Sequence, residues 1–395
     1  MQTIRDIETA DKRVLVRVDF NVPMDDNGTI TDDIRIRTAL PTIEHIMQHG
    51  GKLILCSHLG RPKGTRVEKF SLAPVADHLG KLLKTTVTLA PDCIGEATAA
   101  LVDSMNTGEI LLLENLRFHE GETNNDAAFS KKLAALADIY VNDAFAVSHR
   151  AHASVVGVAE RITIKAAGLQ LEKEMEFFHR SMDEPVRPLV AMVGGAKVSS
   201  KLGALQNMLE KVNTMLIGGA MANTFLQAMG IDMGASKIEG DLLDSARNFI
   251  EMAQKKGVKL YFPVDFVAAQ TFSANAVCKT VPFKDLPHNW MALDIGPAST
   301  LLFKEALEDA GTIIWNGPMG AFEMDAFARG TMSLCRTVAA SQALSITGGG
   351  DSNAAVKKAG EEKNISYMST GGGAFLMLME GKTLPGVDIL SHDMK

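Results

Sequence analysis

The sequence predicts an α/β protein made of two doubly wound (Rossmann-like) parallel-sheet domains joined by a hinge helix. Three observations lead to this fold class. Short apolar runs alternate with helical stretches along all 395 residues. The runs are continuous and rich in leucine and β-branched residues, which is typical of strands buried on both faces of a parallel sheet. A helical stripe followed by two prolines divides the chain near its middle.

The runs that predict strands fall into two groups. The first group is RVLVRVDF (13–20), KLILCSHL (52–59), EILLLENL (109–116) and DIYVNDAF (138–145). The second group is PLVAMVGG (188–195), TMLIGGA (214–220), TIIWNGP (312–318), ALSITGGG (343–350) and ISYMSTGGG (365–373). Helical stretches lie between the runs, for example over 127–137 and 241–257. This alternation predicts the parallel, doubly wound arrangement.

The domain boundary is predicted from one amphipathic stretch. Its apolar stripe, at spacings of four, three and four residues, is Leu171, Met175, Phe178 and Met182. Pro185 and Pro188 then prevent the helix from continuing. We therefore expect a first domain over residues 1–170, a linking helix over 171–187 and a second domain over 188–377.

Composition excludes several classes of protein. The chain has 40 basic and 47 acidic residues, and a net charge of −7 argues against a nucleic-acid binder, which needs a basic field. No apolar run approaches the length of about 18 residues that a membrane span needs. The charged start lacks the apolar run of a signal peptide, so we expect a cytoplasmic protein. The four cysteines, Cys56, Cys93, Cys278 and Cys335, are expected to be buried, reduced thiols.

The strands of the first half are followed by arginine and histidine. These residues and their polar neighbours are Arg17, Asp19, Asn21, Arg35, Arg37, His58, Arg61, Arg117, His119, His149, Arg150 and His152. Each alone could be a surface charge. Ligands of parallel sheets bind at the carboxyl ends of strands, where converging arginines would repel one another without an anion between them. The repetition therefore indicates a small, multiply charged anionic ligand.

The strands of the second half are followed by glycine, in motifs that each precede an expected helix. The motifs are GGAKVSSK (194–201), GGAMANTF (218–225), NGPMGAFE (316–323), GGGDSNAA (348–355) and TGGGAF (370–375). Glycine allows a close approach of backbone to phosphate, and helix starts present free N–H groups. A single pair of glycines can be only a tight turn, and no motif matches GxxxxGK[ST] or a full dinucleotide fingerprint.

Four further side chains of the second half fit a nucleotide. Lys197 and Lys201 could reach phosphate oxygens. Asp351 could hold Mg²⁺ or merely cap a helix, and Glu323 could bind ribose hydroxyls or lie solvated. An acid held by one half and a nucleotide by the other favour phosphoryl transfer. A Rossmann-type dehydrogenase and a two-domain acid-binding protein without catalysis are the alternatives.

The motifs together resemble one known family. RVDFNVP (17–23), HLGRP (58–62), ENLRFH (114–119), DAFAVSHRAHAS (143–154), GGAKVSSK, IGGAMANTF, WNGPMGAFE, GGGDS and STGGGA occur in the order found in phosphoglycerate kinases. The resemblance covers essentially the whole chain. It implies reversible phosphoryl transfer from 1,3-bisphosphoglycerate to ADP, giving 3-phosphoglycerate and MgATP. Two departures are DAFAVS where DAFGTA is commoner and Ser352 where threonine is common.

The resemblance implies a role for each motif residue. The residues that would bind 3-phosphoglycerate are Asp19, Asn21, Arg35, His58, Arg61, Arg117 and Arg150. The residues that would bind ADP or ATP are Gly195, Lys201, Gly218, Gly219, Asn316, Pro318, Glu323, Gly349, Gly350, Asp351 and Ser352. The catalytic residues would be Arg35, Lys197, Lys201, Gly372 and Gly373, with Asp351 at Mg²⁺.

The family also implies how the chain works. We expect direct in-line transfer without a phospho-enzyme, closure of the two domains around the substrates, and a tail over 378–395 that packs back on the first domain. The only expected partners are these small molecules, with no nucleic acid and no membrane, and the protein is expected to be a monomer.

Overall fold

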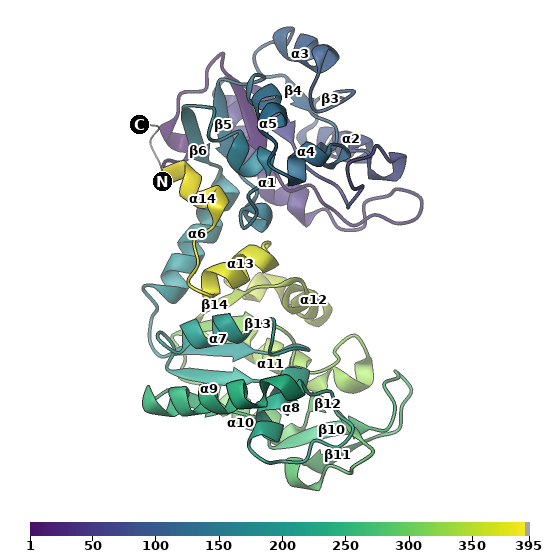
Figure 1. The fold of residues 1–395 in the computed structure, drawn as a ribbon, viewed down its shortest axis with the longest axis vertical. Coiled ribbons are helices and arrows are strands. Elements are labelled where there is room, and N and C mark those ends of the chain that lie inside the picture. The colour runs from purple at the N-terminus through teal and green to yellow at the C-terminus, as the bar shows by residue number, and fades with distance from the viewer. Residues whose placement is uncertain (392–395) are drawn as a thin grey trace. The chain divides into compact units, whose positions relative to one another are not determined.

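The computed structural model describes residues 1–391, which form two compact units (Figure 1). One unit consists of residues 1–175 and 383–391, and the other of residues 176–382. The division falls inside α6 (Leu169–Met182), within the stretch expected to link the domains. No helix of the described residues is long and apolar enough to cross a membrane.

The first unit contains a parallel sheet of six strands in the order β3-β4-β2-β1-β5-β6. Its strands are β1 (Arg13–Arg17), β2 (Lys52–Cys56), β3 (Val87–Leu89), β4 (Ile110–Leu112), β5 (Ile139–Asn142) and β6 (Ile164–Ala167). Its helices are α1 (Ile34–Gln48), α2 (Ala73–Leu83), α3 (Glu96–Asp103), α4 (Glu120–Thr123), α5 (Ala127–Ala134), the start of α6, and α14 (Pro385–Ser391). Short helical turns are η1 (Ile4–Asp6), η2 (Glu68–Phe70), η3 (Leu116–Phe118), η4 (Phe145–Val147) and the π-turn η5 (Ala153–Gly157).

The second unit repeats this plan in the order β15-β14-β13-β7-β8-β9. Its strands are β7 (Leu189–Val193), β8 (Thr214–Ile217), β9 (Lys259–Tyr261), β13 (Thr312–Asn316), β14 (Leu344–Thr347) and β15 (Tyr367–Met368). Its helices are α7 (Leu202–Met208), α8 (Gly219–Ala228), α9 (Leu243–Lys255), α10 (Pro297–Leu307), α11 (Arg329–Ala340), α12 (Gly350–Ala359) and α13 (Gly372–Met379). Its short turns are η6 (Gly240–Leu242), η7 (Phe283–Asp285), η8 (Asp325–Phe327) and η9 (Glu362–Asn364). The prediction of two parallel α/β sheets is confirmed.

The central strands are buried on both faces, as their continuous apolar runs predicted. Every residue of β5, β7, β8 and β13 is buried, and Val14, Val16, Leu53 and Leu55 lie in the core of the first sheet. Burial of such a side chain contributes about 1.5–3 kcal/mol. The sequence prediction omitted the edge strands β3, β6 and β9, because these short strands keep exposed residues and lack a continuous apolar run.

The second unit also contains a small antiparallel sheet that the sequence prediction missed. Its strands are β11 (Cys278–Pro282), β10 (Asp265–Ala269) and β12 (Met291–Ile295), with β10 in the middle. Four of the five residues in β11 are exposed, so the strand has no apolar pattern to recognise. Cys278 lies there and is exposed, which corrects the expectation that all four cysteines are buried; Cys56, Cys93 and Cys335 are buried free thiols.

The start of α6 is anchored in the first unit by polar contacts. Asp143 Oδ1 accepts hydrogen bonds from the backbone N–H groups of Gln170 (2.8 Å) and Leu171 (3.3 Å). Thr42 Oγ1 accepts another from the N–H of Leu169 at 2.8 Å. These acceptors satisfy N–H groups that a helix start leaves free. Burial raises the pKa of the Asp143 carboxyl to about 7.

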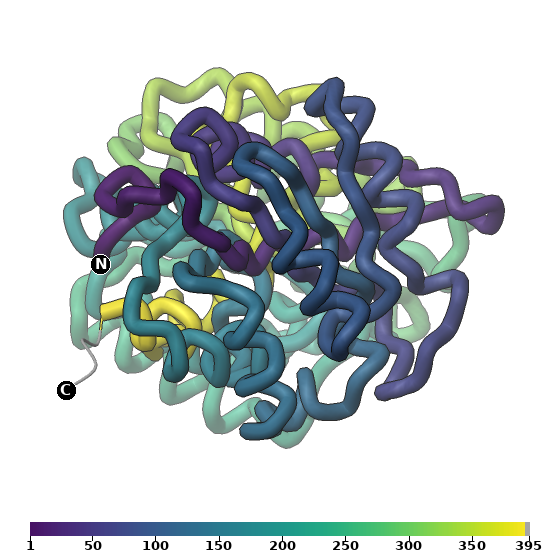
Figure 2. Tube along the Cα trace, turned by 90° about the horizontal axis from the view of Figure 1, so that it is seen from above, coloured from purple at the N-terminus to yellow at the C-terminus, as the bar shows by residue number. Residues whose placement is uncertain are grey.

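The C-terminal helix α14 packs on the first unit, against η5 and β6 (Figure 2). The Asn142 side chain donates a hydrogen bond to the carbonyl of Gly386 at 2.8 Å, and Leu390 is buried. Gly386 allows this close approach, because a Cβ there would lie 2.6 Å from Val155 Cγ1 and 3.0 Å from Ser148 Cα.

We expect Gly386→Ala to lower the free energy of unfolding by about 1–3 kcal/mol, the usual cost of an inserted methyl group in a packed contact. Urea unfolding monitored by circular dichroism measures this change. Gly240→Ala is the matched control, because a Cβ at Gly240 meets nothing within 4 Å. Equal stability of the two variants would contradict the packing described for α14.

Candidate functional site

Polar side chains of the first unit gather at the carboxyl ends of its central strands. Arg17 ends β1, His58 lies two residues after β2, and Asp143 directly follows β5. Strands β2, β3 and β4 lie on one side of β1, and β5 and β6 lie on the other side. The gap between β1 and β5 is therefore the switch point of this sheet. Ligands of doubly wound sheets bind at such a point.

A cavity of about 650 Å³ in this unit is strongly basic. Its lining residues are Arg61, Lys63, Gly64, Arg117, His119, Glu120, Thr123, Asn124 and Arg150. Burial, and then the positive charges of Arg17 and Arg150, lower the pKa of Arg117 to about 10. The cationic groups therefore repel one another in the ligand-free protein, and an anion between them would relieve that repulsion.

Arg117 carries an unused hydrogen-bond donor in this wall. Arg117 as a whole residue is 9% exposed, and its Nη1 donates to the Gly60 carbonyl at 2.8 Å. Its buried Nε finds no hydrogen-bond partner within residues 1–391. A buried N–H without a partner costs about 1–3 kcal/mol. The residue that lines the basic cavity therefore keeps one donor without an acceptor among the described residues.

Arg17 is fully buried at the end of β1, and each of its three side-chain nitrogens has a hydrogen-bond partner. Its Nε donates to Ser154 Oγ at 2.9 Å, its Nη1 to the carbonyl of Val18, and its Nη2 to His58 Nδ1 at 3.1 Å. Because arginine only donates, His58 Nδ1 is the acceptor and the ring proton resides on Nε2. Burial and the neighbouring arginines hold the pKa of His58 well below 6.5, so this ring is neutral.

Glu122 supplies the negative charge below the basic cavity. Its side chain is fully buried, and it accepts hydrogen bonds from Ser154 Oγ (2.7 Å) and from the Ser154 N–H (2.9 Å). Sequence reasoning missed this residue, because HEGET has the appearance of an exposed helical turn. Only the contact with Ser154, 32 residues further along the chain, shows its role.

Asp19, Asn21 and Arg35 lie beside His58 rather than among the lining residues of the basic cavity. Asp19 Oδ2 accepts from Arg35 Nη1 at 2.6 Å, and Asp19 Oδ1 lies 3.9 Å from His58 Nδ1. Asn21 Oδ1 accepts from the Gly60 N–H at 2.8 Å, and Gly60 also accepts from Arg117. The structure thus brings together all seven residues expected to bind the acid, through contacts or through the shared cavity wall.

His152 is a buried histidine next to this cluster, with Nδ1 3.7 Å from Glu122 Oε1. Burial, and then Arg17, Arg117, Arg150 and His149, lower the pKa of His152 from 6.5 to about 4. In the unfolded chain His152 is protonated below about pH 6.5, whereas in the folded protein it is protonated only below about pH 4. Stability from this group falls as the pH is lowered through that window.

We expect His152→Gln to make the free energy of unfolding less sensitive to acid than in the wild type. Between pH 7 and pH 4.5 the free energy of unfolding of the wild type should fall by about 1–2 kcal/mol more than that of the variant. This is less than the ideal change of about 1.4 kcal/mol per pH unit, because solvent screens the site. Urea unfolding of both proteins at the two pH values measures this difference. The contributions of the other titrating groups cancel, because both proteins contain them. Identical losses would mean that His152 titrates normally.

The site of the second unit lies at the switch point between β7 and β13. Lys201 Nζ donates to the carbonyls of Gly194 (2.7 Å) and Asn316 (2.9 Å) and to Asn316 Oδ1 (2.5 Å). It therefore ties the ends of these strands together. Burial lowers the pKa of Lys201 to about 8, while Asp351 acts in the opposite direction.

A cavity of about 460 Å³ lies at this switch point. Its lining residues are Gly195, Ala196, Gly219, Ala220, Lys237, Phe272, Met291, Ala292, Leu293, Pro318, Gly320, Ala321, Glu323 and Asp351. Five of these, Gly195, Gly219, Pro318, Glu323 and Asp351, were expected from sequence. The apolar wall from Phe272, Met291 and Leu293 was missed, because it comes from β12 and the loop between β10 and β11, in the unrecognised antiparallel sheet.

Other expected nucleotide residues brace the loops of the cavity. Ser352 Oγ is fully buried, accepts from the Gly317 N–H (2.7 Å) and donates to the Gly348 carbonyl (2.9 Å), so this hydroxyl is occupied within the protein. Asn316 Nδ2 donates to the same carbonyl at 2.8 Å. Gly349 caps α12, and Gly350 and Asp351 form its first two residues, so Asp351 is not the N-cap.

The remaining expected residues lie on exposed backbone or in close turns. Lys197 is exposed in the loop before α7, where the missed Glu239 accepts from the N–H of Ser199 at 3.1 Å. Gly372 and Gly373 begin α13, and a Cβ on Gly372 would lie 3.2 Å from Gly349 Cα. Glu323 lies in an exposed turn before η8, since the helix expected after its motif begins only at Arg329.

Gly219 allows a close approach of two backbone segments beside the cavity. Its φ is +65°, and a Cβ would lie 2.5 Å from the Gly195 nitrogen and 2.9 Å from the Pro318 carbonyl oxygen. Gly218, the residue before it, is the N-cap of α8. The start of α8 therefore presents backbone rather than side chains to the cavity, as phosphate-binding helix starts do.

A cationic site for a small anion, a glycine-lined cavity at a second switch point and this double α/β fold define a class of protein, the phosphotransferases of α/β fold. The family model described as "Phosphoglycerate kinase" matches residues 4–382. The chain belongs to the phosphoglycerate kinase family.

Individual relatives agree with this assignment. The phosphoglycerate kinase of Desulfotalea psychrophila is 69% identical over 390 residues, which cover 99% of this chain and 100% of the relative. The solved phosphoglycerate kinase of Coxiella burnetii has a TM-score of 0.90 and 42% identity, with 98% of each chain covered. The enzyme from Pyrococcus horikoshii OT3 has a TM-score of 0.85 and 33% identity, over 99% of this chain and 98% of the solved one. The family's reaction is phosphoryl transfer in glycolysis, with the carboxyl group of phosphoglycerate as acceptor in the reverse direction.

Proposed function

We propose that this chain transfers a phosphoryl group between 1,3-bisphosphoglycerate and ADP, with the acid bound in the first unit and the nucleotide in the second. The unpaired Nε of Arg117, buried in a wall of cationic side chains, is the observation that carries the assignment of the acid. A ligand with both a carboxylate and a phosphate offers enough anionic oxygens for several guanidinium groups. Both sites belong to one chain, so a monomer suffices.

The acid side of the proposal divides its residues by role. Arg61, Arg117 and Arg150 bind the phosphate and carboxylate oxygens from the cavity wall. Asp19, Asn21 and His58 bind hydroxyl groups or hold the neighbouring donors, since each is already hydrogen-bonded within the cluster or lies beside it. Arg35 faces the transferring group. Arg35 lies in the first turn of α1, where the helix dipole does not stabilise a cation. Its charge therefore serves ligand binding rather than the stability of the helix.

On the nucleotide side, the glycine-lined cavity takes ADP or ATP. Glu323 binds ribose hydroxyls, and the starts of α8, α12 and α13 present N–H groups to phosphates. Asp351 offers an exposed carboxylate in the first turn of α12, an oxygen ligand that suits Mg²⁺. When bound with the nucleotide, Mg²⁺ would neutralise phosphate charge.

The proposed chemistry is direct in-line transfer. An acyl phosphate has a good leaving group and ADP is already ionised, so catalysis needs positioning and charge stabilisation rather than a strong base. Arg35, Lys197, Lys201 and the N–H groups of Gly372 and Gly373 supply that charge. His58 is not poised as a nucleophile, because its Nδ1 accepts from Arg17 and its Nε2 carries a proton. Donor and acceptor oxygens must become adjacent, so we propose that the two units close around both substrates.

The reaction can be tested with the purified chain. ATP, Mg²⁺ and 3-phosphoglycerate should give oxidation of NADH when glyceraldehyde-3-phosphate dehydrogenase is present as the coupling enzyme. The signal should vanish without either substrate. Binding of the acid without any turnover would instead support a binding protein, and NADH oxidation without the coupling enzyme would support a dehydrogenase.

We expect Gly219→Ala to weaken MgADP binding at least tenfold, about 1.4 kcal/mol or more, because its Cβ would collide with backbone at the cavity wall. Isothermal titration calorimetry measures this affinity. Gly230→Ala is the matched control, since Gly230 also has a positive φ (+86°) but meets nothing within 4 Å. Equal affinities would remove the α8 start from the nucleotide site.

We expect Arg35→Ala to lower kcat/KM at least about 100-fold, which corresponds to a loss of about 3 kcal/mol of transition-state stabilisation. This is the scale of one lost electrostatic donor. Steady-state rates in the coupled assay measure the effect. Arg37→Ala on the same helix is the control, because Arg37 pairs with Asp33 and is exposed. Near wild-type turnover of Arg35→Ala would exclude a catalytic role for this arginine.

A further inference from the structure

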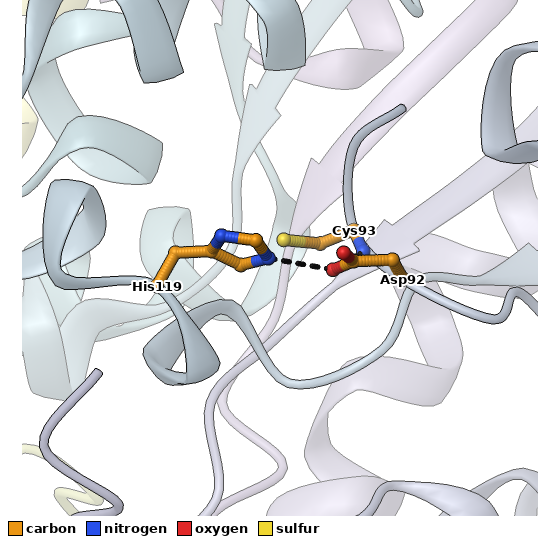
Figure 3. A group of neighbouring side chains, drawn as sticks. All are labelled: Asp92, Cys93 and His119. Carbon is orange, nitrogen blue, oxygen red and sulfur yellow. Dashed lines mark hydrogen bonds and ion pairs between the residues drawn. The ribbon is translucent and has the colours of Figure 1, made fainter. Parts of the chain in front are cut away.

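A group of three metal-ligating side chains lies beside the basic cavity and has no part in the proposed reaction (Figure 3). Asp92 and Cys93 lie in the loop after β3, and His119 directly precedes α4. One donor atom from each of the three residues lies within 4.8 Å of the other two. His119 Nε2 and Asp92 Oδ1 are 2.7 Å apart and form a hydrogen bond, in which the carboxylate oxygen accepts.

The three side chains are held in place by contacts on separate elements. Thr98 Oγ1 donates to the Asp92 carbonyl at 2.8 Å, and Arg66 Nη1 donates to the carbonyl of Pro91 at 2.8 Å. The ring of His119 packs against Phe129, with centroids 5.4 Å apart. The loop and the imidazole are therefore preorganised, which lowers the entropic cost of binding an ion.

The spacing of the donor atoms is close to what a small tetrahedral ion needs. Zinc binds thiolate, imidazole and carboxylate at about 2.0–2.3 Å, so its ligand atoms lie roughly 3.3–3.8 Å apart. Nε2 and Oδ1 are 2.7 Å apart, closer than this range, and no pair of the three donor atoms is more than 4.8 Å apart. Shifts of about an ångström would open a tetrahedral site.

We propose that Asp92, Cys93 and His119 bind a thiophilic divalent cation of the Zn²⁺ type, with water as the fourth ligand. A thiolate, an imidazole nitrogen and a carboxylate form a donor set that zinc accepts, whereas Mg²⁺ and Ca²⁺ prefer oxygen alone. One carboxylate and one thiolate balance the charge of the ion. On binding, the S–H proton of Cys93 passes to solvent as the thiolate–metal bond forms, and the ring proton of His119 is carried on Nδ1 so that Nε2 can bind the metal as a neutral imidazole.

The site is open to solvent on one side. The side chain of Cys93 is buried, but those of His119 and Asp92 are 31% and 43% exposed, so an ion and its water can reach the donors. His119 also lines the basic cavity. The ion would therefore lie in the wall of that cavity. Its binding does not depend on the proposed reaction.

The test is a titration of the full-length protein with Co²⁺, which replaces zinc and reports thiolate ligation by a charge-transfer band in the near ultraviolet. We expect the band to saturate at one ion per chain and to disappear when Zn²⁺ is added. Absence of the band would overturn the proposal, whatever the kinase assay shows.

Three variants identify the ligands. We expect Cys93→Ser to abolish the band and His119→Gln to weaken Co²⁺ binding at least about tenfold, the lower end of what lost supporting groups cost. Cys278→Ser should leave the band unchanged, because this exposed thiol is elsewhere. Circular dichroism checks the fold, and His119→Gln remains informative if Cys93→Ser is unstable. A band that persists in both ligand variants would place the metal at other residues.

Discussion

Parallel strands all end at the same edge of their sheet, and both cavities of this protein depend on that constraint. In the first unit it brings residues after β1, β2 and β5 to one edge, although they come from distant parts of the sequence. In the second unit it brings the turn after β7 next to the turn after β13, where Lys201 can bind both. The same geometry therefore builds an arginine-rich site and a glycine-lined site.

The two sites answer different electrostatic problems. The first gathers cations around the buried carboxylate of Glu122. Burial, and then repulsion from Arg17 and Arg150, lower the pKa of Arg117 there. The second gathers backbone dipoles, which carry no net charge and need only glycine to leave them accessible. An acidic protein can thus present guanidinium groups at one site and backbone N–H groups at the other.

Much of this arrangement could be predicted from sequence. The central strands are continuous apolar runs because both of their faces are buried, and the chemistry of the site begins where each run ends. Arg61, Arg117 and Arg150, which the sequence singled out, line one cavity, and Gly195, Gly219 and Asp351 line the other. Edge strands and the antiparallel sheet gave no such signal, because exposed strands do not need apolar residues. For the same reason the wall from Phe272 and Met291 was missed.

The sequence by itself determined which chemical groups follow each strand, and hence the proposal that one part of the chain binds an acid and another a nucleotide. Only the tertiary structure decided which groups are buried and paired. Glu122 became a counter-charge through contact with Ser154, His58 became a neutral acceptor through Arg17, and Asp92, Cys93 and His119 became neighbours through two separate loops. Burial and long-range contact set the protonation state and the partners of a side chain, and neither is written in the local order of residues.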